Sequence, residues 1–170
     1  MVPLFVIIML LVNGLFLLFM GQQVMSSALV QSAKSMAFDP YVPQRFAEDG
    51  DLSKMIADLF TIGKGNYIST DAWYEEDGDL ETVAKERFLS FIRSDSTKAE
   101  ALLKHFGVKD GAAGIDFSES SVEDGVLTLQ ADYVQEFVFN AAGLASFDRS
   151  LSVQVKLFEY REIEREEDTT

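Results

Sequence analysis

The N-terminal part of the chain combines an apolar run with an amphipathic segment. The first twenty residues contain no charged side chain, and between residues 21 and 36 polar and apolar positions recur at helical spacing. Twenty helical residues at 1.5 Å each cover about 30 Å, the thickness of the hydrocarbon core of a membrane. Pro40 ends the pattern, because the residue before a proline is disfavoured in a helix. We therefore predict one continuous helix over residues 1–38.

Further helical patterns follow this segment. Two near-copies of an acidic turn, EDGDLSK and EDGDLET, each place an aspartate directly after an Asp-Gly pair. Aspartate at this position is a favoured N-cap, so we expect Asp51 and Asp79 each to begin a helix with an apolar face. A third and shorter helix is expected to end at Gly107, because glycine is the common residue just after a helix.

From residue 115 the hydrophobic period changes to that of a strand. Apolar residues alternate with polar ones in three stretches, which predicts antiparallel strands with one face on helices and the other in solvent. The apolar positions are Ile115, Phe117, Leu127, Leu129, Ala131, Tyr133, Leu151, Val153, Val155 and Leu157. We predict an α+β fold, in which a long hydrophobic helix precedes a small head (39–163) of helices packed on an antiparallel β-sheet. Residues 164–170 form a charged tail.

Small residues recur along the N-terminal helix at intervals of seven. Gly14, Gly21, Ala28 and Ser35 therefore share one face, which drifts by about 20° per heptad. Small side chains let apolar helices approach closely, and Asn13 lies beside this face, where a buried amide needs a partner on a neighbouring helix. We predict that these five residues form a helix-packing and assembly face. The alternative interpretation is that glycines and a single asparagine are common in membrane helices.

Composition narrows the classes of partner and chemistry. The chain of 170 residues has a formal net charge of −14, which argues against nucleic acid or anionic lipid as a partner. It contains no cysteine and one histidine, His105, so it offers no thiolate metal site and little imidazole chemistry. The acidic turns also lack the spacing of a calcium-binding loop. We expect no catalytic, cofactor-binding or metal site, and no enzymatic activity.

Three interpretations of the N-terminal helix remain open. A cleaved secretory signal needs a positive first region and a short apolar core, whereas here the first basic residue is Lys34 and the apolar run is longer. Small residues at 26–28 and 35–37 nevertheless offer cleavage positions. A signal anchor would hold an external head at the membrane. A pilin-like stalk would leave the membrane and pack in a filament core, and for that role the helix has to be continuous.

Both ends of the chain carry a family resemblance. The first end reads MVPLFVIIMLLVNGLFLLFMGQQVMSSALVQSAKSMA, and the second reads DGVLTLQADYVQEFVFNAAGLASFDRSLSVQVKLFEY. These stretches resemble the opening and closing regions of TadE-like proteins, which are pilin-like components of tight-adherence pili. The family has an apolar opening segment, a long helix with scattered glutamine and serine, and a closing pair of strands around an apolar loop. In the family's prepilins a glutamate precedes the proline of that segment, whereas here no acidic residue precedes Asp39.

The resemblance implies a structural subunit of a cell-surface filament that polymerises through its N-terminal helix. Its partners would be further copies of itself in a helical homopolymer, or other pilins. The subunit would be inserted in the cytoplasmic membrane before assembly and would be extracellular afterwards. The alternative is a non-polymerising, single-pass membrane-anchored pseudopilin or an accessory protein of a pilus or secretion machine. The division into helix and head also predicts that the head folds, but does not assemble, when residues 1–38 are removed.

Overall fold

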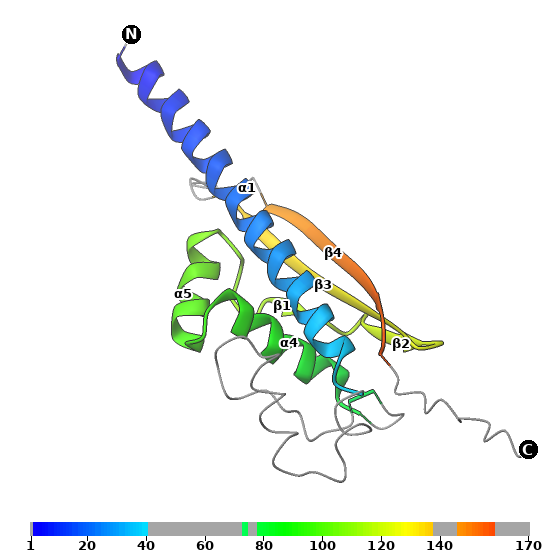
Figure 1. Cartoon of the computed structure of the whole chain (residues 1–170). Helices are drawn as coiled ribbons and strands as arrows, with labels where there is room; N and C mark the ends of the chain where they lie inside the picture. The colour runs from blue at the N-terminus through cyan, green and yellow to red at the C-terminus, as the bar shows by residue number, and fades with distance from the viewer. Residues whose placement is uncertain (1, 41–72, 75–77, 138–145, 159–170) are drawn as a thin grey trace, which may run out of the picture.

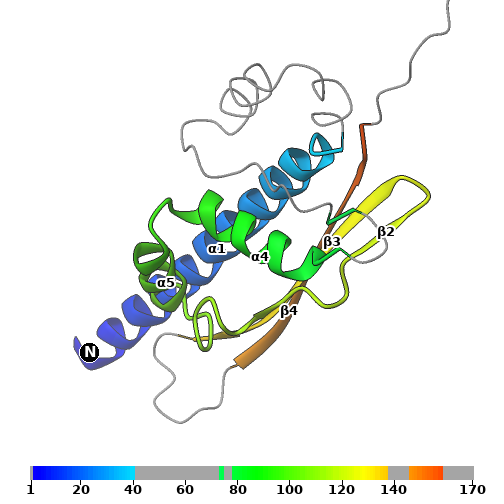
Figure 2. The same ribbon diagram turned by 90° about the horizontal axis from the view of Figure 1, so that it is seen from below.

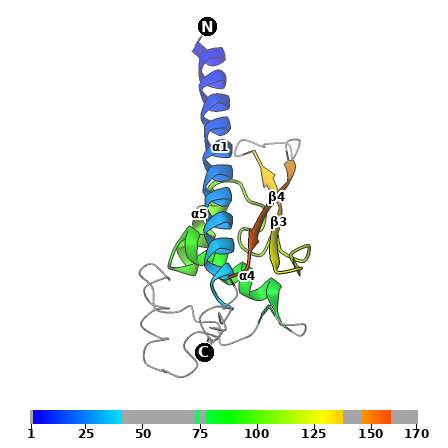
Figure 3. The same ribbon diagram turned by 45° about the vertical axis from the view of Figure 1, so that its right-hand side comes forward.

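The protein is described by a computed structural model, which places residues 2–40, 73–74, 78–137 and 146–158. The longest element is helix α1, Val2–Ala37, which agrees with the continuous helix predicted from the sequence. After Ala37 the backbone N–H groups of Phe38 and Asp39 close a turn ahead of Pro40. The N-terminal half of α1 projects beyond the rest of the molecule, whereas its second half lies along the head (Figures 1 and 3).

Helix α4, Leu80–Ile92, begins directly after Asp79, as predicted from the acidic turn in the sequence. The side chain of Asp79 accepts a hydrogen bond from the Thr82 backbone N–H at 3.0 Å, which satisfies one of the free donors of the first turn. The prediction of Asp79 as an N-cap is therefore confirmed. The matching turn at Asp51, and the helix expected after it, lie outside the described residues.

Helix α5, Ser96–His105, is capped at both of its ends. The Asp95 side chain accepts the Lys98 backbone N–H at 3.1 Å, and Gly107 follows the helix with a φ of +78°. Glycine adopts this left-handed conformation at little cost, which confirms the predicted end of this helix. Helix α4 lies beside the second half of α1, and α5 packs against α4 (Figures 1 and 2).

The four strands of the described residues form one antiparallel sheet. They are β1 (Ile115–Asp116), β2 (Ser121–Glu123), β3 (Val126–Glu136) and β4 (Ser146–Lys156). Strand β3 is central: β4 pairs with it along its whole length, and β1 and β2 share its other edge. The β2–β3 turn has positive φ at Asp124 and Gly125, as a two-residue hairpin turn requires. The predicted α+β fold with an antiparallel sheet is thus present in the structure.

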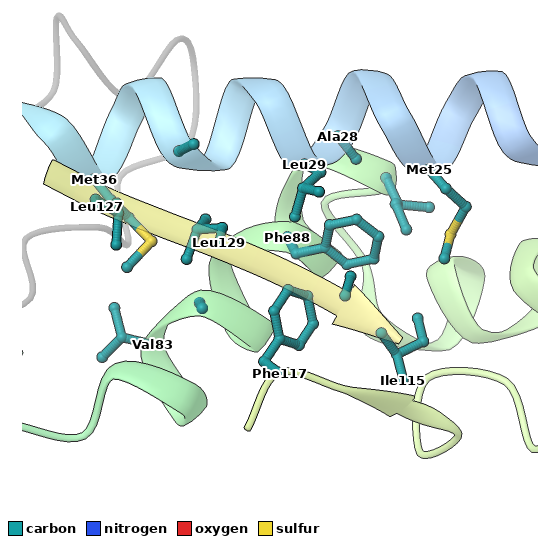
Figure 4. Packing of buried hydrophobic residues seen from close by; sticks show 14 of the residues in the cluster. Met25, Ala28, Leu29, Met36, Val83, Phe88, Ile115, Phe117, Leu127 and Leu129 are labelled. Carbon is teal, nitrogen blue, oxygen red and sulfur yellow. The ribbon is translucent and has the colours of Figure 1, made fainter. Parts of the chain in front are cut away.

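The core lies between α1, α4 and the inner face of the sheet. The alternation predicted for β3 is observed, since every second residue from Leu127 onward is buried and the residues between them are half-exposed. Figure 4 shows Leu29 of α1 pointing toward Phe88 of α4 and toward the strand. Met25 and Met36 of α1 are also fully buried. The second half of α1 is therefore a component of the core of the head and not only a link to it.

Candidate functional site

The first half of α1 exposes a continuous apolar surface. The exposed large side chains here are Leu4, Phe5, Val6, Ile7, Ile8, Met9, Leu10, Leu11, Val12, Leu15, Phe16, Phe19 and Met20, each between 41% and 67% accessible. The helix is long and apolar enough to cross a membrane, judged by its length and composition. An apolar surface of this extent marks a site that another apolar surface covers. We therefore take α1 as the candidate functional site.

One face of α1 is already covered by the head. It repeats at intervals of three and four residues and contains Gly14, Leu18, Gly21, Met25, Ala28, Leu29, Ser32, Ala33 and Met36, all of them buried. This spacing places the side chains on one stripe of the helix. Buried Ser32 is satisfied within the helix, since its hydroxyl donates to the Ala28 carbonyl at 2.7 Å. The stripe therefore buries apolar and small side chains without leaving a polar atom of Ser32 unpaired.

The small residues on this stripe make close contacts within the same chain. A Cβ added at Gly14 would lie 2.5 Å from the Phe137 ring, so the ring is packed directly on the helix backbone. At Gly21 an added Cβ would lie 2.8 Å from the Cβ of Phe106 and 3.1 Å from the side-chain nitrogen of Gln135. The close approach that the glycines permit is therefore used between helix and head. Packing between copies through these residues stays a prediction.

The other two predicted packing residues have different surroundings. Ser35 is half-buried, and its hydroxyl accepts a hydrogen bond from Arg87 at 3.2 Å. Asn13 is exposed and lies outside the head-facing stripe. The structure thus places Gly14, Gly21 and Ala28 on one buried stripe with Ser35 at its edge, and it leaves Asn13 apart from them.

The face of α1 away from the head carries a second stripe. We call it the outward face; its members, which are exposed, are Asn13, Phe16, Met20, Gln23, Ser27, Gln31 and Lys34. It changes from apolar to polar along the helix, and the Gln31 side-chain nitrogen donates to the Ser27 hydroxyl at 3.0 Å. Its apolar part suits lipid or another helix. Its polar part suits water or a polar protein contact, because uncompensated burial of amides and hydroxyls costs free energy.

A buried polar cluster fixes the C-terminal end of α1 to the head. Nη1 of Arg87 lies 2.8 and 2.9 Å from the two carboxylate oxygens of Asp39, and the indole N–H of Trp73 donates to Asp39 at 2.7 Å. The Arg87 side chain is 1% exposed. Burial raises the pKa of Asp39, while the charge of Arg87 and the hydrogen bonds from Arg87 and Trp73 lower it in part. Helix α1, helix α4 and the segment of Trp73 therefore meet at one carboxylate.

Sequence reasoning missed this cluster, although one signal for it is present. Arg87 lies four residues after Val83 and one residue before Phe88, in the middle of the apolar face expected for this helix. An arginine at such a position is seldom buried without a paired charge. The pattern therefore indicated that a carboxylate from elsewhere reaches this face. It did not indicate which of the 28 acidic residues supplies it.

A second buried contact ties the middle of α1 to the sheet. The side-chain nitrogen of Gln135 donates to the carbonyl of Phe106 at 3.0 Å and lies 3.4 Å from the carbonyl of Leu18. Gln135 is fully buried beside Gly21. Because a buried amide is costly unless it is hydrogen-bonded, these contacts favour a single position of α1 relative to β3 and α5.

The head offers no cluster of metal ligands in its described part. No three His, Cys, Asp or Glu side chains are grouped so as to hold an ion among the residues that the structure describes. The ring of His105 lies 5.9 Å from that of its neighbour Phe106 at the end of α5. The chemistry of the described site is therefore that of burial, packing and one ion pair.

Comparison of the chain with models of known protein families, with curated proteins and with solved structures finds no match.

Proposed function

We propose that this chain is a membrane-inserted, pilin-like subunit of a cell-surface filament of the TadE-like type, with α1 as its insertion and assembly element. The observation that carries the proposal is that the two halves of one unbroken helix have different surroundings. Residues Leu4 to Met20 expose apolar side chains, whereas residues from Met25 onward build the core of the head. A subunit that leaves a membrane and enters a filament needs an apolar half and a rigid link to its head.

The outward face of α1 supports assembly between copies. Asn13 is exposed in the apolar half, and an amide in an apolar environment favours a hydrogen-bonding partner on another helix. Further along, Gln23 and Ser27 continue the same face without a charged side chain before Lys34. We infer that neighbouring helices contact this face, since the opposite stripe is occupied by the head.

The second candidate function is that of a membrane-anchored protein that does not polymerise. It is favoured by the contacts of Gly14 and Gly21 within the chain, because these glycines were the residues expected to bring helices of different copies together. In this candidate the apolar half of α1 serves only as an anchor. The head then acts alone at the membrane surface.

Substitution of one exposed serine tests which candidate holds. Ser27→Trp adds a large side chain to the outward face and leaves the head-facing stripe unchanged. The matched control is Ser152→Trp, on the exposed outer side of β4. Cells expressing each variant are sheared, the released material is examined by electron microscopy, and the membrane fraction is extracted with alkaline carbonate.

If the chain polymerises through this face, Ser27→Trp removes filaments, retains membrane insertion and differs from Ser152→Trp, which assembles normally. If neither the unmodified chain nor a variant forms filaments while all remain in the membrane, the anchored, non-polymerising candidate replaces the first. Release of the unmodified chain from membranes by carbonate would contradict both candidates.

A further inference from the structure

The point at which the head first touches α1 limits how the helix can sit in a membrane. The ring of Phe137, just after β3, packs on Gly14. Gly14 lies six residues before Met20, the last exposed large apolar side chain of α1, and six helical residues cover about 9 Å. The head therefore meets α1 at a level where the exposed apolar surface of the helix still continues.

Insertion of α1 places part of the head at membrane depth. On a membrane-inserted α1 we place the boundary of the hydrocarbon core near Met20, because the exposed large apolar side chains end there and Gln22 and Gln23 begin the polar part of the helix. Gly14 then lies about 9 Å inside the boundary, six residues before Met20. The Phe137 ring, which contacts Gly14, has to lie at a similar depth. The exposed apolar side chains of α1 also continue to Met20, past the first contact with the head.

The end of the head at this level carries two phenylalanine side chains, Phe137 and Phe147, between the polar residues Glu136 and Asp148. Phe147, near the start of β4, is 43% exposed, and the other exposed large hydrophobic side chain among the described residues outside α1 is Phe158, at the opposite end of the strand. The guanidinium of Arg149 lies 5.5 Å from the centre of the Phe147 ring. Arginine next to an aromatic ring is suited to the boundary between lipid tails and water.

We propose that the end of the head formed by Phe137 and Phe147 is inserted into the interfacial layer of the bilayer, where lipid covers both phenylalanines together with α1. The proposal rests on the membrane insertion of α1 in the function proposed above. Apolar side chains of interfacial segments commonly reach about 5–10 Å into the boundary of headgroups and acyl chains, which matches the depth calculated for Gly14. Lipid is favoured over a second copy as the occupant because the lipid that covers the exposed apolar side chains of α1 up to Met20 already reaches the level of Phe137 in a single inserted chain.

The chain is well suited to a test by site-specific labelling, because it contains no cysteine. Ser146→Cys and Ser152→Cys introduce the same change at two exposed positions on the same side of β4. They are six residues apart, which is about 20 Å along a strand. Leu10→Cys reports on insertion of the helix itself. Each full-length variant carries an environment-sensitive fluorophore and is reconstituted at low density into phosphatidylcholine vesicles, since neutral lipid avoids repulsion of the acidic chain.

Quenching by spin-labelled lipid and by aqueous iodide is then measured for each label. We expect lipid to quench the labels at residues 10 and 146, and iodide to quench the label at residue 152 several-fold more strongly than the label at residue 146. In the double variant Ser146→Cys, Phe147→Glu the label at residue 146 should become accessible to iodide. The fluorescence of Trp73 reports whether the head of this variant remains folded.

Each other outcome overturns the proposal in a distinguishable way. If the label at residue 10 is inserted but residues 146 and 152 are equally accessible to iodide, the head does not enter the membrane, and insertion of α1 stands. If the label at residue 146 is protected from both quenchers, protein and not lipid covers this end. If the label at residue 10 is itself accessible to iodide, the membrane step of the proposed function fails as well.

Discussion

The two glycines on the head-facing stripe are expected to respond differently to the same substitution. At Gly21 an added Cβ meets the Cβ of Phe106 at 2.8 Å, an atom that is attached directly to the backbone and cannot move by rotation of the side chain. At Gly14 the nearest atom is the tip of the Phe137 ring at 2.5 Å. This ring can turn away at small cost, because only its far end is in conflict. Gly21→Ala and Gly14→Ala therefore form a matched pair.

The expected change in the free energy of unfolding follows from two opposing contributions. Replacing glycine with alanine inside a helix stabilises it by about 1 kcal/mol. Overpacking of a well-packed contact costs about 1–3 kcal/mol. We expect the sum at Gly21 to be a destabilisation of up to about 2 kcal/mol, whereas Gly14→Ala should be neutral or stabilising by up to about 1 kcal/mol. For a chain of this size, 1 kcal/mol shifts the melting temperature by about 2–4 °C.

Thermal unfolding of the full-length variants in detergent micelles measures the difference. The chain has one tryptophan, Trp73, which is 2% exposed and bonded to Asp39, so its fluorescence reports on the core to which α1 is fixed. We expect Gly21→Ala to unfold at a lower temperature than Gly14→Ala. Equal melting temperatures for the two variants would refute the assignment of the glycines to contacts within the chain. Gly21→Leu, which adds more bulk, should lower the melting temperature further.

Gly21→Leu also separates the two packing partners proposed for this face. If the glycines serve contacts between copies, the leucine variant removes filaments without changing the unfolding of the single subunit. If they serve the head, as the contacts of Phe106 and Gln135 indicate, the subunit itself loses stability before assembly. Measurement of unfolding and of filaments on the same variant therefore distinguishes the alternatives.

Four further predictions concern the head and the assembly of the chain. Removing residues 1–13 should leave a folded chain by circular dichroism. Removing residues 1–38 should unfold it, in contrast to the folded head expected from the sequence alone, because α1 supplies part of the core and each buried Leu or Met contributes about 2–5 kcal/mol to a total stability of about 5–15 kcal/mol. A folded 39–170 fragment would contradict this and would support the expectation from the sequence. Arg87→Met should cost about 3–5 kcal/mol near neutral pH by leaving Asp39 buried without its charge partner, and Asp39→Asn should restore part of the loss in chemical denaturation. Burial raises the pKa of Asp39 above the ordinary 3.8, so the folded state binds this proton more tightly than the unfolded state does. The contribution of Asp39 to stability should therefore fall as pH rises from 3.8 through its folded pKa. The pH dependence of unfolding should lose this component in Asp39→Asn, and an unchanged profile would contradict the assignment. If the chain assembles, its net charge of −14 should make filaments shorter at low ionic strength by sedimentation, and longer filaments at low salt would indicate that specific ion pairs dominate.

Local sequence patterns were sufficient to predict the helices and strands whose apolar residues recur at one constant spacing. The alternation from Leu127 to Tyr133 predicted both the strand and its buried face, because only one strand register places all the apolar residues on one side. The cap at Asp79 and the helix end at Gly107 were equally predictable, since each depends on the backbone of a few neighbouring residues. These features require no knowledge of distant parts of the chain.

Contacts between distant parts of the chain were harder to predict from the sequence. The periodic small residues on α1 predicted that something approaches the helix closely, and the structure places Phe106, Gln135 and Phe137 there. The period describes the shape of one surface but not its partner, and a glycine accommodates an aromatic ring of the head as readily as a second helix. The division at residue 38 was drawn from composition, which changes there. The amphipathic pattern between residues 21 and 36 is the signal that the helix before the division packs on the core after it.

The two ends of the contact between helix and sheet determine how α1 and the head move. At one end Phe137 packs on Gly14, and at the other the Phe158 backbone N–H donates to the Ala37 carbonyl at 2.9 Å, with the rings of Phe38 and Phe158 stacked 4.4 Å apart. Between these ends β3 and β4 are paired over eleven consecutive positions. A helix held at both ends and along its length cannot swing relative to the sheet without breaking buried contacts. Any depth that α1 adopts in a membrane is therefore imposed on the head, which is why the position of Phe137 on the helix determines whether Phe147 meets lipid.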